Sequence, residues 1–122
     1  MTGVQTCALP ISIYYGDDMT ARVWDAGTGA EVLALKGHAG RVRSVCWSPD
    51  GLRVATASGD HTARVWDAES GAELLTLKGH PGGVTSVSWS PDGSRIATAS
   101  NDETVVRVWD SRSPAELYAA GR

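Results

Sequence analysis

Residues 37–78 read GHAGRVRSVCWSPDGLRVATASGDHTARVWDAESGAELLTLK, and this stretch decides the fold. It contains four short runs in which β-branched and small residues alternate, a pattern of half-buried strands with no helical period. The runs are separated by the sequences Pro-Asp-Gly, Gly-Asp and Glu-Ser-Gly, which favour tight turns. The stretch therefore predicts a four-stranded antiparallel unit, with strands at residues 41–47, 53–58, 62–67 and 73–78.

The same unit is repeated on both sides of this stretch. Trp-Asp pairs begin at Trp24, Trp66 and Trp109, at spacings of 42 and 43 residues. Longer strings recur in the same order: TARVWDA at 20–26 and 62–68, Gly-His at 37–38 and 79–80, SPDG at 48–51 and 90–93, and ATAS at 55–58 and 97–100. Four-stranded units repeated every 40–45 residues or so are typical of propeller blades.

The ordered Gly-His, Ser-Pro-Asp-Gly and Arg-Val-Trp-Asp motifs resemble those of the Trp-Asp (WD) repeat β-propeller family. The near-identical copies resemble bacterial members in particular, as do Trp47 and Trp89, where many members carry another aromatic residue. The resemblance implies an all-β fold, an open arc of about two and a half four-stranded blades. Because a closed propeller needs about four to eight blades, the arc would be a fragment of one.

The first eleven residues, MTGVQTCALPI, resemble a translated sequencing adapter. A shift of one repeat predicts SPDG at residues 6–9, but the chain reads TCAL there. We expect the natural start of the protein to be missing and the chain to be an internal piece of a longer gene. The expected segments are an adapter-like non-native segment at 1–11, a partial blade at 12–36, a complete blade at 37–78 and a blade with a ragged C-terminal end at 79–122.

Composition argues against several classes of function. The 122 residues carry a net charge of −3, without the basic surplus that nucleic-acid binding needs. No run approaches the roughly 18 apolar residues of a membrane span. The three His are too few and too scattered for a zinc site with Cys partners, and we expect no metal or other cofactor. The expected location is cytoplasmic.

The resemblance also implies a hydrogen-bonded tetrad in each complete blade. The physical role of such a tetrad is to satisfy a buried indole N–H through a Thr hydroxyl, which bonds a His that in turn bonds an Asp. A His, an Asp and a hydroxyl could also suggest nucleophilic catalysis, but an active site is normally single and the tetrad is repeated. The structural tetrads are His38, Thr56, Asp60 and Trp66, and His80, Thr98, Asp102 and Trp109. No catalytic residue is expected.

The tetrad joins the Gly-His loop to the turn between the second and third strands, so both lie at one end of each blade, which we call the tetrad end. Residues at this end that differ between the copies are candidates for binding a partner. Variation on a constant frame is what a recognition surface would show, and it is also what neutral drift would show. The candidates are Arg41, Arg43, Gly59 and His61 in one blade, and Gly83, Thr85, Asn101 and Glu103 in the next.

One spacing differs between the last two copies. Asp60 and Trp66 are six positions apart, but Asp102 and Trp109 are seven apart, and the extra residue is Val105 or Val106. Because strand side chains alternate, an uncompensated insertion would turn Trp109 to the wrong face. We therefore expect an irregularity in this third strand, a β-bulge or a longer turn.

These observations predict a protein-interaction scaffold that is not an enzyme, a fragment of a larger WD-repeat propeller attached to a bacterial signalling protein. The expected partner is a protein or peptide, with self-association through Trp and Val side chains exposed on the terminal blade faces. Two alternatives stay open. One is part of a propeller enzyme with a catalytic site in the central channel, and the other is a fragment with no independent function.

Overall fold

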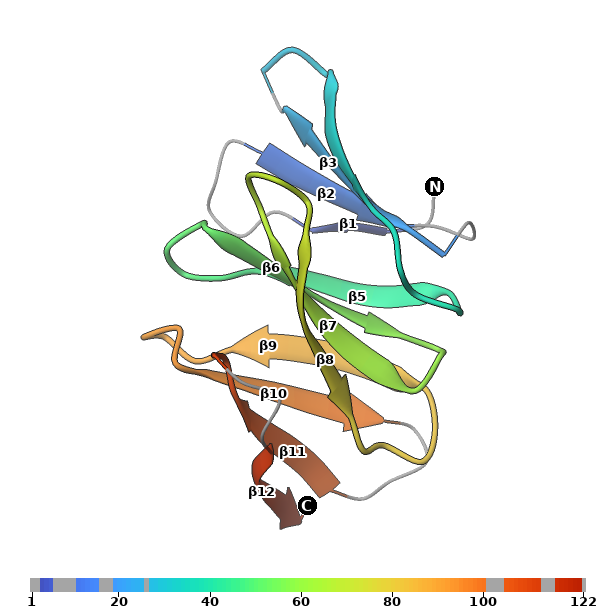
Figure 1. Ribbon diagram of the computed structural model, residues 1–122, viewed down its shortest axis with the longest axis vertical. Coiled ribbons are helices and arrows are strands. Elements are labelled where there is room, and N and C mark those ends of the chain that lie inside the picture. Colours follow the sequence, from blue (N-terminus) through green and yellow to red (C-terminus); the bar gives the residue numbers. More distant parts are fainter. Residues whose placement is uncertain are drawn as a thin grey trace.

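The computed structural model of the chain describes residues 3–5, 11–15, 19–25, 27–100, 105–112 and 116–121. For residues 3–5, 11–15, 105 and 116–121 it describes the backbone alone. Within this part of the chain every element is a β-strand, and the strands form three antiparallel sheets of four strands each. The sheets follow one another along the long axis of the molecule as an open arc (Figure 1).

Each sheet is built from strands that are consecutive in the chain. The first contains β1 (Gly3–Gln5), β2 (Ile11–Tyr15), β3 (Ala21–Asp25) and β4 (Glu31–Leu35). The second contains β5 (Val42–Trp47), β6 (Arg53–Ser58), β7 (Thr62–Asp67) and β8 (Glu73–Lys78). The third contains β9 (Val84–Trp89), β10 (Arg95–Ser100), β11 (Val105–Asp110) and β12 (Glu116–Gly121).

The first sheet has four strands, where the sequence predicted only a partial blade at 12–36. Gly3–Gln5, inside the adapter-like segment, pairs with β2 through Gly3↔Tyr15, Val4↔Tyr14 and Gln5↔Ile13. Strand pairing rests on backbone hydrogen bonds, which any residue except proline can both donate and accept. A short stretch without the repeat motif can therefore complete the sheet.

Of the two predicted ways to accommodate the extra residue, a β-bulge is wrong for the pairing of β10 with β11, and a longer turn would lie in residues 101–104, outside the described part of the chain. Thr98 pairs with Arg107 and Ile96 with Trp109, without a shift, as Thr56 pairs with Arg64 and Val54 with Trp66 in the second sheet. Trp109 is buried. The last pair before the turn is Ala57↔Ala63 in one sheet and Ala99↔Val106 in the other. The extra residue therefore precedes Val106, which leaves the ladder regular.

The apolar core lies in the two seams between neighbouring sheets. Each seam is lined by small and branched residues from the repeated strands and by one indole from the third strand of a sheet. The first seam contains Ala21, Val23, Leu35, Val42, Val45, Trp47, Val54 and Trp66. The second contains Ala55, Ala57, Ala63, Val65, Leu77, Val84, Val87, Ile96 and Trp109.

The expected exposure of Trp on the terminal faces is wrong for the described side chains. Trp47, Trp66 and Trp109 are buried, and the other two Trp are half-buried. The large apolar side chains that are exposed are Met19, Val32, Leu52 and Leu74. Trp47 and Trp66 are covered because they lie in the first seam, Trp109 is covered because it lies in the second, and Trp89 packs against the second seam.

Candidate functional site

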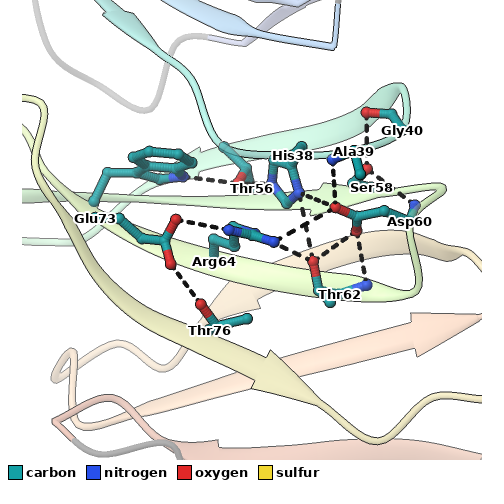
Figure 2. A network of polar contacts seen from close by, with 11 residues as sticks. His38, Ala39, Gly40, Thr56, Ser58, Asp60, Thr62, Arg64, Glu73 and Thr76 are labelled. Atoms are coloured by element: carbon teal, nitrogen blue, oxygen red, sulfur yellow. Dashed lines mark hydrogen bonds and ion pairs between the residues drawn. The ribbon is translucent and has the colours of Figure 1, made fainter.

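The structure brings together the four residues of the tetrad in the second sheet (Figure 2). The indole Nε1 of Trp66 on β7 donates to Thr56 Oγ1 on β6 over 2.8 Å. Thr56 Oγ1 lies 2.6 Å from His38 Nε2, and His38 Nδ1 lies 3.0 Å from Asp60 Oδ2. The His38 and Trp66 rings meet edge to face, with centroids 6.0 Å apart. His38, Thr56 and Trp66 are buried, so the polar atoms of their side chains need the hydrogen-bond partners that this network provides.

The lowered pKa of His38 indicates a neutral ring, and the surrounding groups match that state. With Nδ1–H donated to the Asp60 carboxylate, the unprotonated Nε2 accepts from the Thr56 hydroxyl, which itself accepts from Trp66. Burial lowers the pKa of His38, although the hydrogen bond and the charge of Asp60 act to raise it. This arrangement makes His38 a structural link that stays uncharged.

The Asp60 carboxylate is the hub of the network. Its Oδ2 accepts the Ala39 amide over 2.9 Å, and its Oδ1 accepts the Thr62 hydroxyl over 2.6 Å. Burial raises the pKa of Asp60, but hydrogen bonds from Thr62, Ala39 and His38 outweigh burial and lower that pKa to about 2. The carboxylate is therefore ionised throughout the neutral range.

Three residues of this network, Thr62, Arg64 and Glu73, were not identified from the sequence, although the repeat pattern offers a signal for them. Thr62 bonds Asp60, and Arg64 Nη1 lies 2.7 Å from Glu73 Oε1 and Arg64 Nη2 3.8 Å from Asp60 Oδ2. The first sheet repeats the outer pair, with Arg22 Nη1 2.7 Å from Glu31 Oε1. The recurring TARVWDA string is the signal for the arginines, because Arg22 and Arg64 both lie two positions before its Trp.

In the third sheet three members of the second tetrad come together. His80 Nε2 lies 2.6 Å from Thr98 Oγ1, and Trp109 Nε1 donates to the same oxygen over 2.8 Å. All three side chains are buried. Asp102, the predicted fourth member, lies outside the described residues.

The tetrad of the second sheet fastens the Gly-His loop onto the turn between β6 and β7. The Ser58 hydroxyl donates to the Gly40 carbonyl over 3.0 Å and accepts the Asp60 amide over 3.1 Å. The Gly59 amide donates to the Arg41 carbonyl over 2.8 Å. A Cβ on Gly40 would lie 2.8 Å from Asp60 N, so the loop and the turn approach closely enough to require glycine. One end of the sheet is thereby held in a fixed shape.

The partner-binding candidates lie on this fixed end. Arg41, Arg43 and His61 are exposed, while Gly59, Gly83 and Thr85 are half-buried. Asn101 and Glu103 lie outside the described residues.

Three of these candidates are brought together across the second seam. A Cβ on Gly59 would lie 3.3 Å from Arg43 Nε, and a Cβ on Gly83 would lie 3.3 Å from Gly59 Cα. The structure therefore places the Arg43 guanidinium beside the half-buried backbone of Gly59, which in turn lies against Gly83 of the next sheet. Thr85 is less available, because its hydroxyl donates to the Ala99 carbonyl over 3.3 Å.

Among the described residues no group of three or more His, Cys, Asp or Glu side chains could hold a metal ion. In the same part of the chain no helix is long and apolar enough to cross a membrane.

Comparison with known proteins identifies relatives of the repeat unit. A sequence model of the family described as "WD domain, G-beta repeat" matches residues 29–67 and 71–110. Coronin-7 of Mus musculus is 51% identical over 43 residues, which are 35% of this chain and 5% of that protein. Ribosome assembly protein 4 of Chaetomium thermophilum is 56% identical over 34 residues, which are 28% of this chain and 7% of that protein. The matched part of this chain thus spans less than a tenth of the length of these relatives.

Proposed function

The chain belongs to the WD40 repeat family, whose members generally act as non-catalytic scaffolds for protein–protein interaction, and from this premise we propose that the tetrad end binds a protein or peptide. The observation that carries this proposal is the meeting of Arg43, Gly59 and Gly83 across the second seam. These residues differ between the copies, while the tetrads beneath them do not.

The charge of this surface favours a partner with acidic side chains. Arg41 and Arg43 are both exposed on the same strand end, two positions apart. Arginine presents several donors in a planar fork that matches carboxylates, and complementary charges at an interface mainly increase specificity and the association rate. Gly59 and Gly83 carry no side chain, so a partner's backbone can approach the seam closely.

The test is selection of peptide ligands on the intact chain followed by measurement of their affinity. We expect the selected peptides to be acidic, and Arg41→Glu/Arg43→Glu to weaken their binding by about tenfold or more, because two favourable contacts become repulsive. Arg95→Glu/Arg112→Glu is the charge-matched control at the opposite end of the sheets, where both arginines are exposed. Equal weakening by the two double variants would contradict the proposal.

We also propose that the repeat array is part of a larger propeller attached to a bacterial signalling protein in the cytoplasm. Support comes from the near identity of the copies and from the need of a closed propeller for about four to eight blades. Sequencing the gene on both sides of the coding segment tests this. Further repeats followed by a signalling module are expected, and flanks without repeats would refute the idea.

A further inference from the structure

The second seam is fastened by an arginine that crosses it. Arg53, the first residue of β6, places its guanidinium carbon 4.8 Å from the centre of the Trp89 ring in the next sheet. Its Nη1 donates to the Ser111 carbonyl, and its Nη2 donates to the Gly93 carbonyl over 3.4 Å. In the opposite direction, Trp89 Nε1 donates to the Cys46 carbonyl over 3.1 Å. The third sheet thus provides a complete site for a guanidinium group.

The second sheet contains a hollow of about 290 Å³ at the corresponding place, with Ala68 in place of Ser111, whose hydroxyl accepts from Arg53 Nη2 over 3.3 Å. The hollow is lined by Trp47, Gly51, Leu52, Asp67, Ala68 and Glu69. In the repeat these residues correspond to Trp89, Gly93, Ser94, Asp110, Ser111 and Arg112, which include all the contacts of Arg53. The backbones also correspond, because the Ala68 amide donates to the Leu52 carbonyl and the Ser111 amide to the Ser94 carbonyl, each over 3.0 Å.

The first sheet has no arginine at the position that would reach this hollow. Ile11 pairs with Asp25, as Arg53 pairs with Asp67 and Arg95 with Asp110, so Ile11 holds the register position of the crossing arginine. In addition, Trp47 is buried and its Nε1 has no hydrogen-bond partner in the described part of the chain, unlike Trp89. The first seam therefore lacks the fastening that the second seam has.

We propose that the hollow beside Trp47 is a binding site for a guanidinium group, and that its ligand is an arginine side chain from a peptide. Trp47 lines the hollow at the repeat position that Trp89 holds beneath Arg53, so the cation would contact the part of this largely buried indole that borders the hollow. Gly51 and Ala68, which line the hollow, correspond in the repeat to Gly93 and Ser111, whose carbonyls accept from Arg53.

Charge makes the hollow a better cation site than its copy in the third sheet. Asp67 and Glu69 both line it, whereas the corresponding residues of the third sheet are Asp110 and Arg112. One carboxylate oxygen of Asp67 also accepts the amides of the following turn, over 2.8 and 3.2 Å, which fixes the carboxylate in place. Leu52 and Glu69 are exposed, so the hollow opens to solvent. It lies at the end of the sheet opposite to the proposed interaction surface, and the two sites are independent.

The direct test is a titration of the ¹⁵N-labelled chain with Nα-acetyl-arginine amide, followed by NMR at the indole N–H signals. We expect a saturable shift of the Trp47 signal with a dissociation constant on the order of millimolar, because a cation–π contact with a few hydrogen bonds contributes modestly. The Trp89 signal should not move, since Arg53 already lies on that ring. Nα-acetyl-citrulline amide, planar but uncharged, and Nα-acetyl-lysine amide, charged but not planar, should bind at least several-fold more weakly. Absence of saturation, equal shifts of all indoles, or equal responses to the three probes would overturn the proposal.

A pair of reciprocal substitutions tests the site without relying on affinity. Ile11→Arg should fill the hollow from within the chain, raise the melting temperature by about 4 °C and abolish the response of Trp47 to the probe. Ile11→Lys is the control that adds charge without the planar fork, and it should keep most of the response. Arg53→Ile should create a new probe-dependent shift at Trp89. An Ile11→Arg chain that binds the probe as well as the original chain does would overturn the assignment.

Discussion

At the scale of single residues, the hydroxyl of Thr56 supports two rings at once. It accepts from Trp66 Nε1 and donates to His38 Nε2, and it is fully buried. The sequence allowed this role to be predicted because the residue types recur at matched spacings. It did not reveal that Asp60 also accepts from Thr62 and from the Ala39 amide, since those contacts depend on how the loop and the turn approach each other.

We expect Thr56→Val to lower the free energy of unfolding by about 1–3 kcal/mol, because it leaves a buried indole N–H and a buried imidazole nitrogen without their partner. The shape of the side chain is nearly unchanged, so lost hydrogen bonding accounts for the effect. Urea denaturation followed by Trp fluorescence measures the loss. Thr76→Val is the matched control on the outer strand, where the hydroxyl bonds the exposed Glu73, and it should cost clearly less. Equal losses would show that the tetrad adds no stability.

The tetrad should make the chain sensitive to acid. Burial holds the pKa of His38 below its ordinary value of 6.5 in the folded chain, so the unfolded chain binds more protons as the pH falls below 6.5. Asp60, with a pKa of about 2 in the folded chain against 3.8 ordinarily, contributes stability above pH 3.8 that is lost as the pH falls toward 2. The melting temperature should therefore fall from pH 7.5 to 5, and fall further below pH 4.

Two variants test the contribution of His38. His61→Gln, at an exposed position, should keep the decrease between pH 7.5 and 5, whereas His38→Asn should lose much of it. A melting temperature of the original chain that stays constant over this range would contradict the assigned state of His38.

At the scale of elements, the strands of the second sheet were predicted almost to the residue. Three of them begin and end where the alternation does, and the first begins one residue later, at Val42. Strand pairing within a sheet could be predicted because it is local and the turns are visible in the sequence. The contact of Arg53 with Trp89 could not, because the repeat period does not tell which side chains of neighbouring sheets face each other across a seam.

The approach of the Gly-His loop to the turn between β6 and β7 gives a prediction at this scale. Gly40→Ala should destabilise the chain by about 1–3 kcal/mol, because its Cβ would lie 2.8 Å from the backbone nitrogen of Asp60 and would push two elements apart. Gly27→Ala is the control, since its Cβ would meet only the end of the Asp25 side chain at 3.3 Å. Denaturation curves of the two variants decide the matter, and an unchanged midpoint for Gly40→Ala would refute the close approach.

At the scale of the whole molecule, one face of the third sheet is partly open, whereas the equivalent face of the second sheet is covered. Ala55 and Val65 are 1% and 0% exposed in the second seam. The corresponding Ala97 and Val108 of the third sheet are half-buried. Within the described chain no further sheet lies against them, so part of an apolar face meets solvent.

This open face predicts concentration-dependent self-association, measurable by size-exclusion chromatography with light scattering across a dilution series. Ala97→Glu should reduce the association while leaving the chain folded, because the charge enters a face that is already partly in water. The same substitution at the equivalent Ala55 should unfold the chain, because it buries an unpaired charge in a closed seam. A monomer at all concentrations, for the original chain and for Ala97→Glu alike, would rule out association through this face.

The order of strands within each sheet also has a consequence during synthesis. Since each sheet consists of four strands that are consecutive in the chain, a sheet needs nothing from later parts of the chain in order to form. The second sheet can assemble once Lys78 has left the ribosome, and its seam with the first sheet can close before all of the third sheet has emerged. We therefore expect the seams to close one after another in the direction of translation, so that on each ribosome the newest sheet is the one whose apolar face is still open.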